Sequence, residues 1–223
     1  MIDVQQGFEQ ITDPFSIHLA YNVLTNEQLL SLLATAPTDG YSVARVEDPD
    51  HDKQYAFQIL SLQQGGVLTE AAGMLAPNWR ALLESLRSEE FMDWLERGTG
   101  LRLRELGTDI AIYAYGPSDF ISVHKDKPYK AATAILYLNP EWPADGGGDY
   151  EVRVSADPAL PPVRRIPPAG GQLLAFPPTE VSWHSVSEVR RHVTQKRLTV
   201  QLEFWLVENP TRHYHEKPVE TTR

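Results

Sequence analysis

The chain has 223 residues, no cysteine, a formal net charge of −10 at pH 7 and a sequence pI near 5.1. The lack of cysteine excludes disulfides, zinc–cysteine sites, iron–sulfur clusters and a thiol nucleophile. The acidic balance disfavours a nucleic-acid partner, and with it nucleic-acid demethylation, because phosphate binding needs a basic surface. Apolar runs are shorter than the roughly 20 residues that span a membrane. The first residues lack the basic and apolar regions of a signal peptide, so we expect none. We therefore expect a cytoplasmic protein without a membrane partner.

The first hundred residues predict a strand, a helix, a pair of strands and then more helices. Asn26 is expected to cap the first helix, whose apolar face is formed by leucines. Farther along, Trp79 and Leu82 begin a Trp and Leu stripe at helical spacing, which predicts helices that buttress a sheet. His51 lies in a polar loop and is interpreted as solvated. The expected strands span 14–24, 41–47 and 54–62, and the expected helices span 28–36 and parts of 68–99.

From residue 101 onward the hydrophobic pattern has a period of two, and Pro- and Gly-rich turns interrupt it. Eight short strands with regular turns predict a sandwich or barrel, so the fold class is mainly β with flanking helices. We expect one domain over 1–223, with an N-terminal strand and buttressing helices (1–100), a β core (101–207) and a C-terminal tail (208–223). The predicted strands of the core span 101–115, 120–126, 131–138, 149–154, 162–166, 172–176, 181–187 and 196–207.

Three side chains form a candidate metal site. His124 and Asp126 are two residues apart in a predicted strand, so both should point to one face of the sheet. His184 lies in another strand-like segment. Two imidazoles and one carboxylate, with coordination positions left open, are the ligand set of non-haem Fe(II) oxygenases. Zinc hydrolysis can use a similar triad, so these residues alone leave the metal undecided.

The last predicted strand contains a candidate carboxylate clamp. Arg197 and Thr199 share one face of it, and an arginine inside a β-barrel is costly unless it meets an anion. A guanidinium binds a carboxylate bidentately, and a nearby hydroxyl can add a bond. Tyr137 lies inside the predicted barrel, where its phenol needs a polar partner. Tyr115 is equally compatible with that role and with ordinary core packing.

The order of these motifs resembles that of the 2-oxoglutarate- and Fe(II)-dependent dioxygenases, in particular the prolyl-4-hydroxylase-like subgroup. The resemblance covers about residues 100–207. The motifs that carry it are His124-Lys-Asp126, Thr133-Ala-Ile-Leu-Tyr-Leu-Asn139, Asp145-Gly-Gly-Gly-Asp-Tyr150, Trp183-His-Ser-Val186 and Arg197-Leu-Thr199.

The resemblance implies a double-stranded β-helix, the jelly-roll fold of cupins. It implies that Fe(II) is bound by His124, Asp126 and His184, and that Arg197 holds the distal carboxylate of 2-oxoglutarate. Further contacts to 2-oxoglutarate are implied for Tyr137, Thr199 and Tyr115. The implied reaction uses O₂ to hydroxylate an unactivated C–H bond and releases succinate and CO₂, with ascorbate as a candidate stimulant. Asp126 occupies the position that related halogenases leave open, which favours hydroxylation; desaturation and ring closure stay open.

One departure affects the clamp. Arg197 lies 13 residues after His184, a few more than is usual in the subgroup. Arg190 and Arg191 fall in the extra length and are therefore rivals of Arg197, or they belong to a turn that faces substrate or solvent. Two further histidines near the C-terminus, His213 and His215, are expected to have no metal role, because no third ligand is evident.

The substrate is not specified by these motifs. We expect a small amino-acid-like, peptidyl or natural-product substrate, framed by loops 41–58, 139–148 and 155–170. Trp142, Arg164 and Arg165 are candidate contacts, and a homodimer is a candidate assembly. The alternatives are a prolyl hydroxylase that acts on a protein and, from a different class, a non-catalytic jelly-roll binding module or a cupin-like metal hydrolase.

Overall fold

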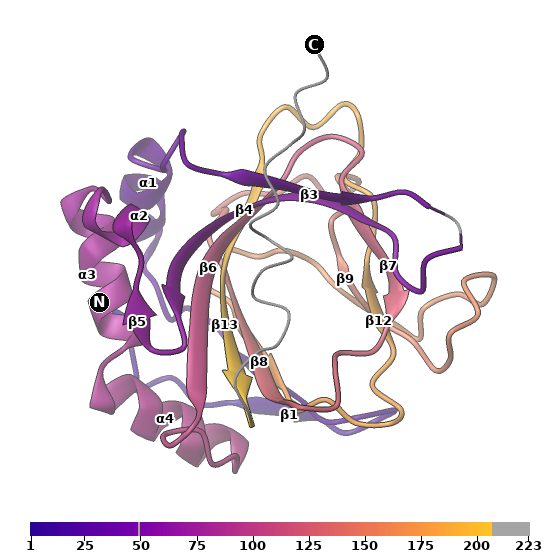
Figure 1. Ribbon diagram of the computed structural model, residues 1–223, viewed down its shortest axis with the longest axis horizontal. Helices are drawn as coiled ribbons and strands as arrows, with labels where there is room; N and C mark the ends of the chain where they lie inside the picture. Colours follow the sequence, from indigo (N-terminus) through magenta and orange to yellow (C-terminus); the bar gives the residue numbers. More distant parts are fainter. Residues whose placement is uncertain (49, 207–223) are drawn as a thin grey trace.

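A computed structural model describes residues 1–48 and 50–206. Its centre is a single curled antiparallel sheet, which confirms the mainly β fold class (Figure 1). Among the described residues the strands are β1 (Glu9–Ile11), β2 (Ile17–Ala20), β3 (Ser42–Val46), β4 (Tyr55–Gln64), β5 (Val67–Leu68), β6 (Gly107–Tyr115), β7 (Phe120–His124), β8 (Lys130–Tyr137), β9 (Tyr150–Val152), β10 (Arg164–Ile166), β11 (Leu173–Phe176), β12 (His184–Val186) and β13 (Arg197–Trp205).

The strands follow the order β1-β2-β11-β8-β13-β6-β4-β7-β12-β9-β10, and β3 and β5 both pair with β4. The sheet curls until its two ends face each other. One buried cluster joins Leu19 of β2, Tyr137 of β8 and Phe176 of β11 to Tyr150 and Val152 of β9, across the inside of the curl. The concave inner face therefore encloses a space that strands from both ends of the sheet surround.

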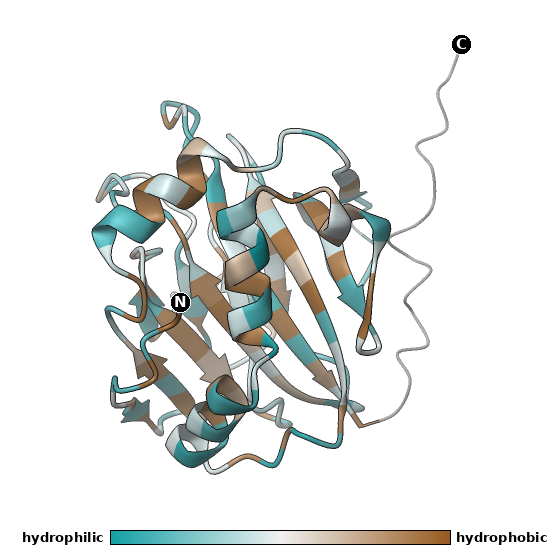
Figure 2. Ribbon diagram, turned by 90° about the vertical axis from the view of Figure 1, so that its left-hand side faces the viewer, coloured by the Kyte–Doolittle hydropathy of each residue, from teal (hydrophilic) through white to brown (hydrophobic). Residues whose placement is uncertain are grey.

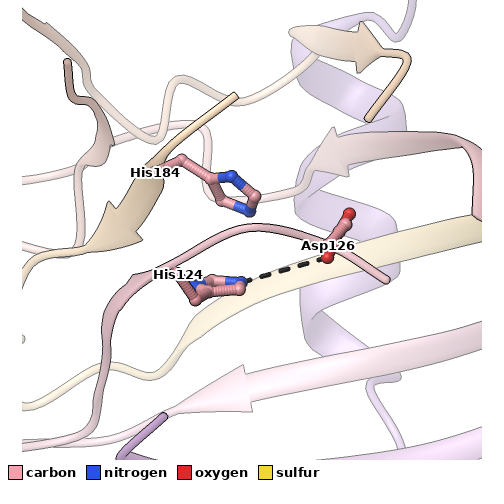
Figure 3. Close-up of side chains that lie close together, drawn as sticks. All are labelled: His124, Asp126 and His184. Carbon is pink, nitrogen blue, oxygen red and sulfur yellow. Dashed lines mark ion pairs between the residues drawn. The ribbon is translucent and has the colours of Figure 1, made fainter. Parts of the chain in front are cut away.

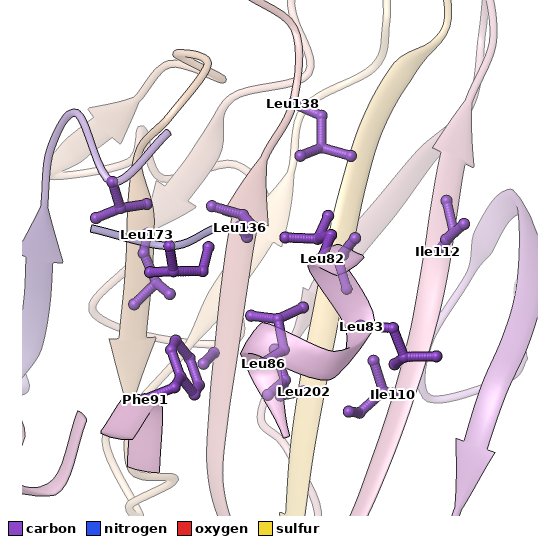
Figure 4. Close-up of a cluster of buried hydrophobic side chains, with 14 of the residues drawn as sticks. Leu82, Leu83, Leu86, Phe91, Ile110, Ile112, Leu136, Leu138, Leu173 and Leu202 are labelled. Atoms are coloured by element: carbon purple, nitrogen blue, oxygen red, sulfur yellow. The ribbon is translucent and has the colours of Figure 1, made fainter. Parts of the chain in front are cut away.

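Within residues 1–48 and 50–206, four helices cover the outer face of the broad half of the sheet (Figures 1 and 2). Leu82 and Leu86 pack on apolar residues of β6, β8 and β13, as Figure 4 shows. The Trp79 indole N–H also donates to the carbonyl of Leu32 at 2.9 Å, which ties two of the helices together. These helices are α1 (Asn26–Ala34), α2 (Glu70–Gly73), α3 (Pro77–Leu86) and α4 (Glu89–Thr99).

The two faces of β13 divide the core from the inner space. Leu198, Val200 and Leu202 belong to the cluster under the helices. Arg197 and Thr199 alternate with them and are also buried, so they point into the curl, as strand periodicity requires. The prediction from period two was therefore right for this strand.

Several predicted boundaries were wrong. Thr25, rather than Asn26, caps the first helix: its hydroxyl accepts from the backbone N–H of Gln28, in a reciprocal capping box. The predicted strand 120–126 ends at His124, so Asp126 lies just beyond it. Strands β1 to β5, all from the first hundred residues, join the same sheet as the later strands.

His213, His215 and the predicted tail lie outside the described residues. Within the part of the chain that the structure describes, no helix is long and apolar enough to cross a membrane.

Candidate active site

His124, Asp126 and His184 come together inside the curl. His184 begins β12 and lies directly opposite His124, the last residue of β7, in the antiparallel pairing of the two strands. One potential ligand atom from each residue lies within 4.8 Å of the other two (Figure 3). The His124 Nε2–Asp126 Oδ1 distance is 3.9 Å. The three residues are therefore placed to hold one metal ion, although only the two histidines belong to strands.

The imidazole rings are oriented by their own strands. His124 Nδ1 donates to the carbonyl of Ser122 at 2.9 Å. His184 Nδ1 donates to the carbonyl of Ser182, also at 2.9 Å. Because a carbonyl can only accept, the proton of each neutral ring is on Nδ1, and each Nε2 keeps its lone pair. Burial lowers the pKa of both rings, so both are neutral at pH 7, the form that binds a metal.

Asp126 is held by neighbours that were not predicted. Its Oδ2 accepts from the Thr133 hydroxyl at 2.9 Å and lies 3.3 Å from the Lys130 ammonium. Lys130 also donates to Glu203 Oε1 at 2.8 Å and lies over the Trp205 ring. Burial alone would raise the pKa of Asp126, but the Lys130 ammonium keeps it far below its usual range. Asp126 is therefore ionised, with Oδ1 on the side of the histidines.

Arg197 is the centre of a second polar group in the same space. Its side chain is 1% exposed, and the guanidinium carbon lies 4.8 Å from the ring centre of Tyr115 and 5.1 Å from that of Tyr137. Arg197 Nε and Nη1, both tyrosine hydroxyls and the Thr199 hydroxyl have no hydrogen-bond partner among the described residues. A buried cation beside several unpaired donors is costly unless an anion completes it. These residues therefore fit a carboxylate such as that of 2-oxoglutarate.

A glycine turn makes room for the guanidinium. Gly148 has a φ of +73°, and a Cβ at this position would lie 2.9 Å from Arg197 Cδ. Gly147 has a φ of +65°, and a Cβ there would collide with the carbonyl of Glu188. The close approach of backbone that the Gly-Gly turn predicts is therefore present, and at Gly148 the neighbour is the predicted clamp itself.

The rival arginines lie elsewhere. Arg190 and Arg191 are both exposed, and Arg191 Nε donates to the Ser118 hydroxyl at 3.3 Å. Neither meets the requirement of a buried cation. His51 is exposed as well, and its Nδ1 contacts the carbonyl of Lys53 at 2.8 Å.

Two of the three candidate substrate contacts, Trp142 and Arg165, already bond to other residues of the protein. The Trp142 indole N–H donates to the carbonyl of Gly147 at 2.8 Å and so supports the glycine turn. Arg165 is exposed and pairs with Glu151, and Arg164 is exposed beside it on β10. These side chains lie at loops and an edge strand, and their role toward a substrate stays a prediction.

A cleft of about 420 Å³ opens on the inner face of β13, β6 and β4. Tyr113, Gln201 and Glu203 contribute to its wall. Glu203 also bonds to Lys130, which in turn pairs with Asp126, so the cleft begins one side chain away from the predicted metal ligands. Its size is that of ligand sites in general.

Like Lys130, Tyr150 was not predicted from the sequence to have a role in the site. It follows the glycine turn on β9, is 1% exposed, and stacks on His184 with the ring centres 5.3 Å apart. The sequence signal for Tyr150 was its place two residues after Gly148. Lys130 gave a weaker signal, a lysine four residues after Asp126, because lysines are seldom buried.

Comparisons with known proteins agree with this architecture. The sequence model of the 2OG-Fe(II) oxygenase superfamily matches residues 110–206, a span that contains every predicted site residue. A Pseudomonas putida prolyl-4-hydroxylase has the same fold, with a TM-score of 0.53 and 20% identity over 90% of this chain and 92% of that chain. A 2OG-Fe(II) oxygenase family oxidoreductase from Burkholderia pseudomallei gives a TM-score of 0.60 and 16% identity, with 88% of each chain covered.

Among curated proteins, the prolyl 3-hydroxylase OGFOD1 of Xenopus laevis is 31% identical over 138 residues, which cover 59% of this chain and 26% of the relative. The chain thus spans about a quarter of the length of the curated relatives it matches. Residues 110–206 of this chain thus resemble the 2OG-Fe(II) oxygenase superfamily, and the matched proteins include prolyl hydroxylases. The matching superfamily is named for 2-oxoglutarate and Fe(II), the two molecules that the Arg197 group and the predicted metal ligands would hold.

Proposed function

We propose that this protein is an Fe(II)- and 2-oxoglutarate-dependent dioxygenase that hydroxylates a C–H bond of a peptidyl substrate. The observation that supports this most directly is Arg197, a buried cation with unpaired donors, in the same enclosed space as His124, Asp126 and His184. A metal hydrolase or a binding module has no use for an unpaired guanidinium beside a metal triad. A 2-oxo acid that reaches from the guanidinium to the metal uses both.

In this proposal His124, Asp126 and His184 bind the metal through the two Nε2 atoms and a carboxylate oxygen. The Nδ1–H bonds to strand carbonyls fix the ring planes, and Lys130 with Thr133 fixes the carboxylate. Three ligands on one face leave coordination positions for other molecules. The chain thereby sets the geometry of the centre before any substrate is present.

Arg197, with Tyr137, Thr199 and Tyr115, binds the distal carboxylate of 2-oxoglutarate and points its 2-oxo acid end at the metal. When bound, Fe(II), 2-oxoglutarate and O₂ would supply the oxidising chemistry: one oxygen atom of O₂ would enter the C–H bond as C–OH, and the other would enter succinate, with CO₂ released. Burial of Arg197, Tyr115 and Tyr137 keeps water out of this end of the space. Exclusion of water strengthens each charge-assisted bond made there.

For the substrate, we infer a peptidyl residue, with proline as the first candidate. The support is twofold: matched relatives are named as prolyl hydroxylases, and a cleft of about 420 Å³ is lined in part by Glu203, which bonds to Lys130 beside Asp126. A free amino acid or natural-product intermediate is the competing substrate class. The fold alone does not choose between them, because one fold hosts many substrates.

The test is an anaerobic titration of the metal-free protein with Fe(II) and then with 2-oxoglutarate, followed in visible light. We expect a charge-transfer band in the wild type. Arg197→Ala should need far more 2-oxoglutarate to give the same band, and Asp126→Ala should give no turnover. Succinate release is then screened against proline-containing peptides and free amino acids. A protein that gives no band and retains zinc after purification would instead be a hydrolase or a binding module.

A further inference from the structure

Tyr150 carries a polar atom that the fold does not use. Its side chain is 1% exposed, and its hydroxyl has no hydrogen-bond partner within residues 1–48 and 50–206. Buried hydroxyls are nearly always paired, because water solvates them well and an apolar interior does not. A phenylalanine would fill the same volume without this cost. The hydroxyl therefore needs a partner that the protein itself does not supply.

Packing fixes the direction of the phenol. The Tyr150 ring lies nearly parallel to the His184 imidazole, with 17° between the planes and 5.3 Å between the centres. On another side it meets Phe176, at 5.7 Å between ring centres and 52° between the planes. A ring held on two sides by buried neighbours cannot turn its hydroxyl to solvent.

Tyr150 lies between residues of the predicted metal centre and residues of the clamp: its ring stacks on His184, and it packs in one cluster with Tyr137. Tyr150 and Tyr137 belong to one buried cluster inside the curl. Burial raises the pKa of the Tyr150 hydroxyl well above 10, and Asp126 and then Tyr137 raise it further. The Tyr150 ring thus contacts a predicted metal ligand, His184, and shares a buried cluster with Tyr137, whose ring contacts the Arg197 guanidinium.

We propose that Tyr150 binds 2-oxoglutarate at its 2-oxo acid end, by donating its hydroxyl hydrogen to an oxygen of the 1-carboxylate, the group that succinate lacks. This rests on the proposed function. The distal carboxylate already has donors from Arg197 and its neighbours. Tyr150 is stacked on a predicted metal ligand, so its hydroxyl meets the opposite end of the same molecule.

The experiment compares two ligands on Mn(II)-loaded protein, where no oxidation takes place. 2-Oxoglutarate and succinate share the distal carboxylate, and succinate lacks the 2-oxo acid end that Tyr150 would contact. Calorimetry gives the Kd of both ligands for wild type, Tyr150→Phe and Tyr137→Phe. Tyr150→Phe should weaken 2-oxoglutarate about tenfold or more and leave succinate unchanged. Tyr137→Phe should weaken both ligands.

The matched control is Tyr21→Phe, an exposed tyrosine just after β2, which should change neither Kd. An unchanged 2-oxoglutarate Kd in Tyr150→Phe would overturn the inference, and so would equal weakening of both ligands. Thermal melting of the metal-free variants checks that the fold is kept. A wild type that binds no 2-oxoglutarate would instead defeat the proposed function, which separates the two failures.

Discussion

The two faces of the β9–β12 pair contain polar groups of opposite kinds. On the outer face Glu151 accepts from Arg153 Nη2 at 2.6 Å, from the Ser185 hydroxyl at 2.8 Å and from Arg165 Nε at 3.2 Å. On the inner face the adjacent residue Tyr150 has an unpaired hydroxyl, as does Tyr137 across the curl. Both groups are buried, so burial alone does not distinguish them.

The difference is whether the protein completes its own bonds. The outer network needs nothing from outside, and a complete polar network rigidifies the strands that it joins. The inner group around Arg197 is incomplete in the protein alone, and a bound carboxylate would complete it. A buried polar group with unpaired atoms thus indicates a binding site, whereas one with every atom paired indicates a structural element.

The largest effect should come from removing the centre of the outer network. Glu151→Ala leaves Arg153 and Ser185 without their acceptor and should lower the free energy of unfolding by about 3 kcal/mol. Urea unfolding measures this, with the exposed Glu188→Ala as the control. The folded variant should keep its 2-oxoglutarate Kd. A large loss of affinity at unchanged stability would contradict the structural role.

The converse is expected for Arg197→Met. Loss of charge-assisted hydrogen bonds should weaken 2-oxoglutarate by about 100-fold, or roughly 3 kcal/mol. The stability of the protein without ligand should stay the same or rise, because an unpaired buried charge is replaced by an apolar side chain of similar size. Calorimetry and urea unfolding test the two halves. Arg190→Met is the matched control; if it abolished binding while Arg197→Met did not, the exposed arginine would be the clamp.

Gly148→Ala should lower both the stability of the protein and its affinity for 2-oxoglutarate. The φ of +73° costs a residue other than glycine about 1–2 kcal/mol, and the new Cβ would press on Arg197 Cδ. We expect lower stability by that amount, together with weaker 2-oxoglutarate binding. Gly7→Ala is the control, because a Cβ there meets no atom within 4 Å. Unchanged binding in Gly148→Ala would mean that the turn does not position the clamp.

The smallest expected effect is on the stability of the protein at acidic pH. Burial would raise the pKa of Glu151, but bonds from Arg153, Ser185 and Arg165 lower it below its ordinary value. A carboxyl whose pKa is lower in the folded protein contributes its full stabilisation of the fold at pH values above its unfolded pKa, near 4.5. The contribution is lost as the pH falls through the folded-state pKa. The stability of wild type should therefore fall more steeply below pH 4.5 than that of Glu151→Gln. Equal slopes would show that the network does not act through this carboxylate.

Features that depend on residues close together in the sequence were predictable, whereas features that depend on contacts between distant segments were not. The inward direction of Arg197 and Thr199 was predictable because alternation along a strand is local. The proximity of His184 to His124 depends on the pairing of β12 with β7, which no local pattern contains. This proximity was predicted only because the order of the motifs resembles that of a known family.

Lys130 and Tyr150 were missed for a related reason. A lysine at the start of a strand is expected in solvent, and only the three-dimensional structure shows that Asp126 and Glu203 enclose it. Tyr150 belonged to a motif interpreted for its glycines. In both cases the side chain's environment, rather than its identity, carries the information.

The two histidines share a short sequence pattern with its own consequence. Ser122-Val-His124 and Ser182-Trp-His184 each place a ring whose Nδ1–H is bonded to the carbonyl two residues earlier. Each tripeptide is thus a self-contained unit that sets its own ring plane and proton position, independent of the other strand. Removing the metal leaves both units intact, so the entropy of arranging these two ligands is lost during folding and need not be lost again when metal binds.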